Sequence, residues 1–255
     1  DAPIAPNPRR VRWLLAEKGV TDLEVVEIDI PGGQHKTPDF LDKAGLANLP
    51  ALELDDGVWI TESLAICRYL ESRYPEPNLF GRDPQETAII EMWTRRAEFL
   101  VALPFMLGVR HGHPGFAALE TQVPAVAQWN QQSALNALAI LDRRLAESEW
   151  LGADRLTIAD IVAFVGIDFA RIVRLRPPEE LKGVGRWLAA MRERPAAAAY
   201  PETVAGVIAV APHIVVEELS IRSIEAAKHV YVTADLKSRL ARYHDDPDSA
   251  FGGWN

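Results

Sequence analysis

Residues 48–66 read NLPALELDDGVWITESLAI and carry the strongest indication of the fold. The segments Ala51-Leu52-Glu53-Leu54 and Val58-Trp59-Ile60 flank the turn Asp55-Asp56-Gly57, and an Asp-Gly turn between two such segments predicts a β-hairpin. Apolar residues then recur at helical spacing, which predicts a helix over residues 62–74. The stretch therefore predicts an antiparallel strand pair that leads directly into a helix.

The residues before this hairpin predict one more helix and one more strand. Asn7 at the N-cap, Pro8 at the first helical position and Gly19 just past the end frame a helix of about three turns. Residues 23–30 are rich in β-branched side chains, which predicts a strand. A βαβ unit needs a further strand at its front, and we expect that strand to lie mostly before Asp1.

The residues after the hairpin are helical in pattern. Predicted helices cover residues 85–107, 125–148, 157–172 and 181–192, the third opened by a capping-box pattern at Thr157–Asp160. The order of elements predicts an α/β domain followed by an all-α domain. We expect an α/β domain over residues 1–79, a linker over 80–86, a helical domain over 87–200 and an extension of unassigned role over 201–255.

The composition narrows the class of protein. The formal net charge of −9 argues against a nucleic-acid partner, and no apolar run is long enough to span a membrane. Cys67, the one cysteine, excludes an intramolecular disulfide and any CxxC pair in this sequence, which fits a cytoplasmic location. Cys67 falls on an apolar helical face, so we expect a buried residue that is no nucleophile.

The turn Ala5-Pro6-Asn7-Pro8 is the first candidate for chemistry. It opens a helix, where free N–H groups and the helix dipole favour a negative charge such as a thiolate. Simple capping by Asn7 is the alternative, and on this segment alone it is the favoured interpretation.

Three further segments carry groups suited to a small peptide. Asn48-Leu49-Pro50 enters a strand, where proline indicates either a plain strand start or a cis bond that turns neighbouring backbone groups outward. At a strand-to-helix junction, Glu62 offers an anion for an ammonium group and Ser63 offers donors for a carboxylate, although an ordinary helix start has the same pattern. His35 and Lys36 are cations for a second carboxylate, or residues of a solvated loop.

Together these motifs resemble those of the glutathione transferase family. The resemblance rests on five segments in the same order and spacing: Asn7–Val11, His35–Phe40, Asn48–Leu52, Thr61–Ile66 and Leu156–Asp160. It covers about residues 1–200. It implies a thioredoxin-like N-terminal domain, an all-helical C-terminal domain, a homodimer, and glutathione as co-substrate with no metal.

The resemblance also implies roles for individual residues. Asn48, Leu49 and Pro50 match the family's cis-proline segment, whose neighbour pairs with the cysteinyl part of glutathione. Glu62 and Ser63 match the pair that holds the γ-glutamyl end. In some classes, residues like His35 and Lys36 meet the glycine carboxylate.

The sequence departs from the family at the position of the catalytic thiol or hydroxyl. Ala5 stands where many members keep serine or cysteine, and Ala5–Pro8 replaces the CxxC of glutaredoxin-like relatives. Asn7 is the remaining polar side chain and our candidate catalytic residue. It matches the Pro-Asn of Nu-class-like bacterial enzymes, which lean toward disulfide reduction, but their accompanying threonine is absent.

The sequence therefore predicts a glutathione transferase that activates the thiol of bound glutathione for attack on a small electrophile. Two alternatives stay open. One is a glutathione-dependent disulfide reductase of the same fold, and the other is a glutathione-binding protein without catalysis, which Ala5 would suit.

Five residues of the helical domain are candidates for the pocket of the second substrate: Trp93, Arg110, His111, His113 and Phe169. For each of the apolar ones, packing in the helical core is the alternative. His111 and His113 have no nearby third ligand, so we expect no metal site there.

Overall fold

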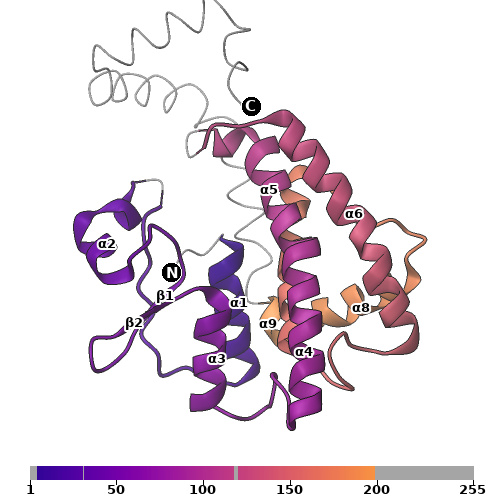
Figure 1. Ribbon diagram of the computed structural model, residues 1–255, viewed down its shortest axis with the longest axis horizontal. Coiled ribbons are helices and arrows are strands. Elements are labelled where there is room, and N and C mark those ends of the chain that lie inside the picture. The colour runs from indigo at the N-terminus through magenta and orange to yellow at the C-terminus, as the bar shows by residue number, and fades with distance from the viewer. Residues whose placement is uncertain (1–4, 31, 118–119, 199–255) are drawn as a thin grey trace, which may run out of the picture. The chain divides into compact units, whose positions relative to one another are not determined.

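The computed structural model describes residues 5–30, 32–117 and 120–198, and all structural statements below concern these residues. The strand expected before Asp1 and the extension 201–255 lie outside them. The α/β part consists of α1 (Pro6–Glu17), a 3₁₀ turn (Gln34–Lys36), α2 (Pro38–Ala44), β1 (Ala51–Glu53), β2 (Trp59–Thr61) and α3 (Ser63–Arg73) (Figure 1).

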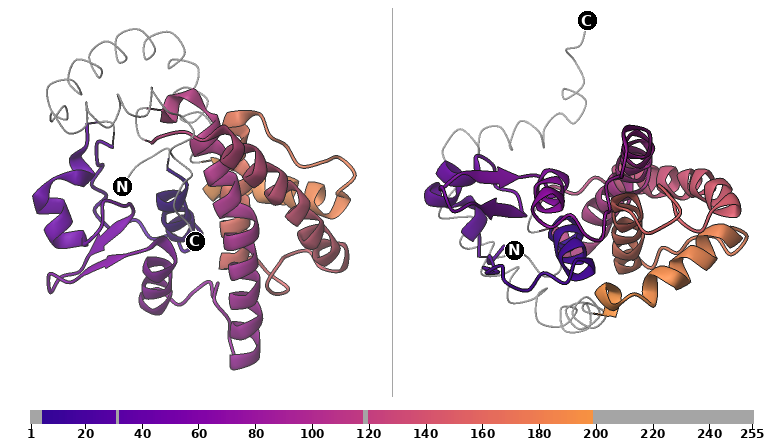
Figure 2. Two further views of the ribbon diagram at one scale, coloured as in Figure 1. Left: turned by 45° about the horizontal axis from the view of Figure 1, so that its top comes forward. Right: turned by 90° about the horizontal axis from the view of Figure 1, so that it is seen from below.

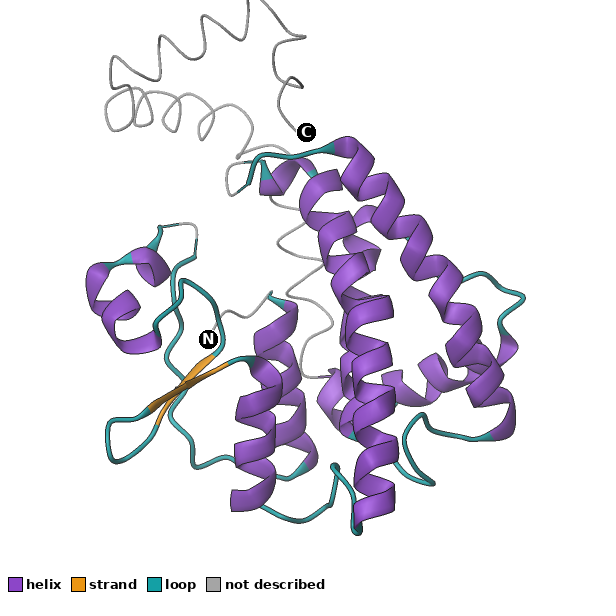
Figure 3. Cartoon of the chain, viewed as in Figure 1, coloured by secondary structure: helices purple, strands orange, loops and turns teal. Residues whose placement is uncertain are grey.

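The predicted hairpin is confirmed. β1 and β2 pair antiparallel with Ala51 opposite Thr61, and the Leu54 N–H donates to the Val58 carbonyl at 2.9 Å. Gly57 closes the turn at a φ of 83°, where glycine has no steric cost. Figure 3 shows the two strands of this hairpin in orange, and α3 follows β2 directly.

The strand predicted over residues 23–30 is not formed within the described residues. The ladder between β1 and β2 does not include this segment, and Val25 and Val26 are 56% and 58% exposed. β-branched composition indicates side chains that suit a pleated, half-buried surface, whereas these two valines are exposed.

The start of the first helix also differs from the prediction. α1 begins at Pro6, its N-cap is Ala5, and Asn7 lies inside the first turn. Proline fixes a helical φ and fits the first helical position, so Pro6 starts the helix before Asn7 can cap it. The capping role expected for Asn7 is therefore wrong.

The helical part contains the predicted helices with adjusted ends. They are α4 (Pro84–Arg96), α5 (Leu103–Gly112), α6 (Pro124–Glu147), α7 (Ile158–Phe169), α8 (Lys182–Arg192) and the short α9 (Pro195–Ala198). A π-helical segment, Ala97–Ala102, joins α4 to α5. Because α5 ends at Gly112, the helix predicted over residues 85–107 is longer than expected. α7 ends at Phe169 and continues as a 3₁₀ turn, Ala170–Val173.

α7 forms the centre of the helical core. Eleven of its residues are buried, and the capping box between Thr157 and Asp160 is present. Asp160 is fully buried and accepts hydrogen bonds from the Leu151 N–H at 2.9 Å, the Trp187 indole at 3.0 Å, and the N–H and hydroxyl of Thr157. Burial raises the pKa of Asp160, and these donated hydrogen bonds oppose the rise.

α1 connects the α/β part to the helical part. It contacts both α3 and α7, and α1 and α3 lie side by side in Figures 1 and 2. Arg9 pairs with Asp168 at 2.6 Å, and Glu17 binds Arg194 through both carboxylate oxygens. The Arg9 pair lies near the N-terminal end of α1 and the Glu17 pair at its C-terminal end, so both ends of α1 are attached to the helical domain.

Candidate functional site

The junction between β2 and α3 places Glu62 in an unusual backbone conformation. Glu62 has φ 66° and ψ 118°, and among the described residues only Arg174 is another non-glycine with positive φ. Such conformations store strain and cluster at functional sites. The Glu62 side chain is exposed and forms no ion pair with the described residues, so its carboxylate is free to meet a cation.

Ser63, the next residue, is buried and receives a hydrogen bond from α1. Its hydroxyl oxygen accepts from Arg10 Nη1 at 3.3 Å, and the same nitrogen lies 3.1 Å from Glu98 of the π-helical segment. Because the oxygen of Ser63 accepts from Arg10, its hydroxyl hydrogen is still available for an acceptor.

Arg10 is the buried charge behind this junction. Its side chain is 2% exposed, and its Nε has no hydrogen-bond partner. Burial lowers the pKa of Arg10, while Glu98 acts in the opposite direction. Because the Arg10 guanidinium lies within hydrogen-bond distance of Ser63, it adds a positive potential to the start of α3.

The first prediction concerns the position of this guanidinium. Arg10→Lys keeps the charge, but a lysine has no planar guanidinium to hold a nitrogen where Nη1 lies between Ser63 and Glu98, so one hydrogen bond is lost. We expect glutathione to bind about fivefold more weakly and the free energy of unfolding to fall by about 1 kcal/mol. Calorimetric titration and urea unfolding measure the two. Unchanged affinity in the folded variant would show that Arg10 does not position Ser63.

The register of the hairpin brings the second motif to the same end. The Leu49–Pro50 bond is cis, as the resemblance implies, and Pro50 directly precedes β1. Ala51 pairs with Thr61 across the hairpin. Pro50 directly precedes Ala51 and Glu62 directly follows Thr61, so both lie next to the same residue pair. The two candidate motifs therefore meet at one end of the hairpin, and Asn48 is exposed.

The third motif lies on the 3₁₀ turn before α2. His35 is buried and burial lowers its pKa, with Lys36 adding to the effect, so His35 is neutral at pH 7. Lys36 is exposed and remains the cation of this pair. Phe40 of α2 contacts Trp59 of β2 edge-on at 6.2 Å, which attaches the turn to the hairpin.

Asn7 lies on the first turn of α1. Its Oδ1 is buried without a hydrogen-bond partner. Pro6 and Pro8 on either side lack an N–H, so the Asn7 N–H is the one backbone donor of the first three helical positions. The side-chain amide and this N–H are together what the helix start offers to an anion.

The residues expected to line a second-substrate pocket do not form one group. Trp93 is 8% exposed within the core, with the Arg96 guanidinium over its ring at 4.7 Å. The core alternative is therefore correct for Trp93. His113 and Phe169 are connected through Phe116, whose ring lies 6.2 Å from the first and 6.3 Å from the second.

Arg110 and His111 have partners of their own. Arg110 Nε lies 2.6 Å from Glu120, and His111 Nδ1 accepts from the Val123 N–H at 3.3 Å. These contacts hold the segment that follows α5 rather than leaving both side chains free for a ligand. Within the described residues, no three potential ligands gather as a metal site would require.

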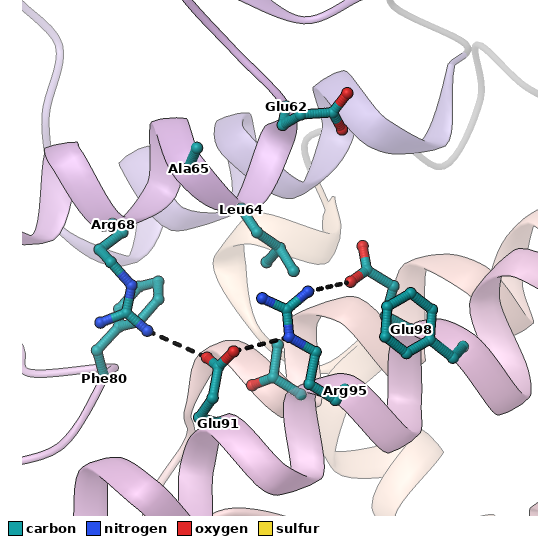
Figure 4. A pocket seen from close by; sticks show the side chains of 10 residues that line it. Glu62, Leu64, Ala65, Arg68, Phe80, Glu91, Arg95 and Glu98 are labelled. Atoms are coloured by element: carbon teal, nitrogen blue, oxygen red, sulfur yellow. Dashed lines mark hydrogen bonds and ion pairs between the residues drawn. The ribbon is translucent and has the colours of Figure 1, made fainter.

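Sequence reasoning missed a cavity of about 490 Å³ between α3 and α4, shown in Figure 4. Ion pairs connect Arg68 to Glu91 at 3.1 Å, Glu91 to Arg95 at 2.7 Å and Arg95 to Glu98 at 3.2 Å. Glu62 lines the same cavity. The spacing of Glu91, Arg95 and Glu98 along one helix was the available signal.

Among the helices of the described residues, none combines the length and the apolar character that a membrane span requires.

Comparisons with known proteins agree with this arrangement. The family model of the glutathione S-transferase N-terminal domain matches residues 4–73, and that of the C-terminal domain matches residues 120–195. Glutathione S-transferase 2 of Saccharomyces cerevisiae is 35% identical over 199 residues, which cover 76% of this chain and 85% of that protein.

Solved structures show the same relation. A glutathione S-transferase domain-containing protein of Marinobacter aquaeolei superposes with a TM-score of 0.74 at 39% identity, covering 77% of this chain and 98% of the other. Gtt2 of Saccharomyces cerevisiae superposes with a TM-score of 0.73 at 34% identity, covering 78% and 98%. The chain, with its thioredoxin-like N-terminal domain and helical C-terminal domain, belongs to the glutathione S-transferase family.

Proposed function

We propose that this glutathione transferase holds glutathione at the β2–α3 junction and activates its thiol near Asn7. The observation that carries the proposal is the meeting of Pro50, Glu62 and Ser63 at one end of the hairpin, with Arg10 buried behind them. Glu62 would accept from the ammonium of the γ-glutamyl group, and Ser63 would donate to its carboxylate. Lys36 supplies a cation for the glycine carboxylate.

The chemistry uses the thiol of glutathione itself. A free thiol ionises near pH 8.5, so only a few per cent is thiolate at pH 7. Two groups at the start of α1, the Asn7 N–H and the Asn7 amide, would donate to the sulfur and shift it toward thiolate. The thiolate then attacks a carbon of a small electrophile and forms the thioether bond of a conjugate. With an aryl halide the halide leaves with the electron pair, and with an epoxide or enone the electron pair stays on the acceptor, which takes up a proton.

Asn7→Ala tests the side-chain part of this activation. The variant keeps the backbone N–H, so the shift is partial: we expect the pKa of the bound thiol to rise by about one to two units. Because Asn7 is no cap, stability should change by less than about 0.5 kcal/mol. Ultraviolet absorbance of the thiolate against pH measures the pKa of the bound thiol, and turnover on a model electrophile is measured in parallel.

Asn7→Asp is the matched control for shape. It replaces the donor by an anion, so the pKa of the bound thiol should rise further than in Asn7→Ala. If neither variant moves the titration or the turnover, Asn7 plays no part in holding the sulfur.

A disulfide reductase remains the second candidate. Cys67 is fully buried and burial raises its pKa to about 12, so the chain has no thiolate of its own for exchange. Two glutathione molecules would have to supply both sulfurs. Release of a free thiol from a glutathione-capped disulfide, with no conjugate formed from any electrophile, would favour this function over transfer.

The second substrate is not fixed by family membership. Mouse maleylacetoacetate isomerase is 45% identical to this chain over 85 residues, which cover 38% of that protein. A relative with a different activity in its name shares that much sequence, so similarity alone does not choose the acceptor. A small electrophile is our proposal, and a panel of aryl halides, epoxides and enones tests it.

We further propose a cytoplasmic homodimer that pairs through the face of α3 and α4. Five large apolar side chains are exposed there or on the adjoining π-helical segment and α5: Tyr69, Met92, Phe99, Leu100 and Leu103, at 38%, 40%, 54%, 40% and 39%. Exposed apolar side chains of this size favour an interface between copies. The buried single cysteine supports the reducing compartment.

The dimer predicts a change of mass on one substitution. Phe99→Asp buries a charge in the interface, and light scattering should then report one chain, 28.2 kDa, instead of twice that mass. Trp129→Asp is the control, because Trp129 is 70% exposed on α6 and should leave the dimer intact. A parent protein that already has the mass of one chain at micromolar concentration would contradict the proposal.

A further inference from the structure

The first turn of α1, which carries Asn7, is closed by a long hydrogen bond. The Arg9 N–H donates to the Ala5 carbonyl at 3.3 Å, which is longer than most hydrogen bonds of this kind. Between these two residues, Pro6 and Pro8 have no N–H to add. The backbone therefore holds this turn weakly, and the position of the turn depends on the contacts of its side chains.

The side chain of Arg9 attaches this turn to α7. Its Nη1 lies 2.6 Å from Asp168 Oδ2, and the two side chains are only 9% and 11% exposed. The guanidinium also lies over the rings of Trp13 and Phe164, 5.8 Å from each ring centroid, and these rings contact each other edge-on at 4.9 Å. An ion pair and two aromatic rings together hold the guanidinium in one place.

Asp168 is itself held firmly on α7. Its second oxygen, Oδ1, accepts from Arg171 Nη1 at 2.7 Å, from the 3₁₀ turn that follows the helix. Burial acts to raise the pKa of Asp168, but pairing with Arg9 and Arg171 outweighs this effect and lowers it, so Asp168 is an anion at neutral pH. The pair therefore connects a weakly held turn to the helix at the centre of the core.

An anchor at this place affects the chemistry of the turn. Catalytic groups act only from the right position, and a misplacement of about 1 Å can lower a rate about a hundredfold. We propose that Asp168 is a positioning residue for the transfer reaction: through Arg9 it holds the turn on which Asn7 meets the sulfur of glutathione. This inference rests on the proposed function of Asn7 and extends it to a residue 159 positions from Arg9 along the chain.

Asp168→Ala removes the anchor and leaves Asn7 unchanged. The pKa of the bound thiol should rise by about 0.5–1 unit, and kcat should fall about three- to tenfold at a pH below that pKa, where one unit is a tenfold change in thiolate. KM for glutathione should change by less than about twofold, because Glu62 and Ser63 hold its γ-glutamyl end. Ultraviolet absorbance of the thiolate against pH and initial rates with an aryl halide measure these quantities.

Glu17→Ala is the matched control at the other end of α1. Glu17 binds Arg194 through both carboxylate oxygens, so this variant also removes an acidic partner that attaches α1 to the helical domain. Both variants should lower the unfolding temperature. Glu17 lies about 15 Å along the helix axis from Asn7, so the pKa of the bound thiol should change by less than about 0.2 unit in Glu17→Ala.

Arg9→Lys is a milder variant that should fold even if Asp168→Ala does not. Lysine keeps the charge and still reaches Asp168, but it has no planar group to lie against Trp13 and Phe164. The turn is then held less firmly, and the pKa of the bound thiol should rise by about half the shift of Asp168→Ala.

Two results would overturn the proposal. One is a thiol pKa that stays unchanged in the folded Asp168 and Arg9 variants, and the other is an equal rise in Glu17→Ala, which would show a general effect of lost stability. Asn7→Ala distinguishes this failure from that of the proposed function. If Asn7→Ala raises the pKa and the Asp168 and Arg9 variants do not, Asn7 acts without the anchor. An unchanged titration in Asn7→Ala overturns the proposed role of Asn7, and the positioning role with it.

Discussion

Replacing Asp160 with alanine should lower the free energy of unfolding by about 3–5 kcal/mol, the largest stability effect that we expect. The carboxylate accepts from Leu151, from Trp187 and twice from Thr157, all in a buried setting. Alanine leaves these donors without a partner inside the core, and each buried unsatisfied donor costs about 1–3 kcal/mol. Urea unfolding followed by circular dichroism measures the loss.

Asp160→Asn separates the acceptors of this carboxylate. The amide oxygen still accepts on one side, but its NH₂ group faces donors on the other, so the loss should be about half that of alanine. If both variants lower the free energy of unfolding by less than about 1 kcal/mol, the hydrogen bonds of Asp160 do not stabilise the core.

Glu62→Gly should have opposite effects on binding and on stability. Glycine has no Cβ clash at φ 66°, so the fold should gain about 0.5–1 kcal/mol after the entropy cost of glycine. The lost carboxylate no longer meets the ammonium of glutathione, so affinity should fall at least about tenfold, since a charge-assisted hydrogen bond contributes about 1.5–3 kcal/mol. Thermal unfolding and calorimetric titration give the two quantities.

Arg174→Gly is the matched control for backbone strain. Arg174 has φ 61° at the end of the 3₁₀ turn that follows α7. It should show the stability gain without any loss of glutathione affinity. Glu62→Ala should show the loss of affinity without the gain, because alanine keeps the Cβ. Full affinity in folded Glu62→Ala would remove Glu62 from the site.

The sequence was sufficient for the elements that depend on local signals. The Asp-Gly turn at residues 56–57 and the capping box at Thr157–Asp160 act over a few residues, and both are present in the structure. The strand predicted over 23–30 is not formed in the described residues, because β-branched composition is a weak, context-dependent indication of strand. The prediction that Asn7 is the N-cap was wrong because it started the helix at Pro8, whereas the observed helix starts at Pro6.

The candidate site shows the same division. Glu62, Ser63 and Pro50 are candidates predicted from their motifs, and the register of the hairpin brings them together. Arg10 was not found, since its contacts are 53 residues away at Ser63 and 88 residues away at Glu98. Contacts across such separations follow from packing of α1 against the rest of the fold, which periodicity does not describe.

The central claim is that Glu62 and Ser63 hold the γ-glutamyl end of glutathione. A crystal structure of the chain with bound glutathione tests it most directly. We expect the ligand's ammonium group within hydrogen-bond distance of the Glu62 carboxylate, its neighbouring carboxylate on Ser63, and its sulfur beside Asn7 at the start of α1. Glutathione bound elsewhere, with Glu62 and Ser63 making no contact to it, would contradict the claim.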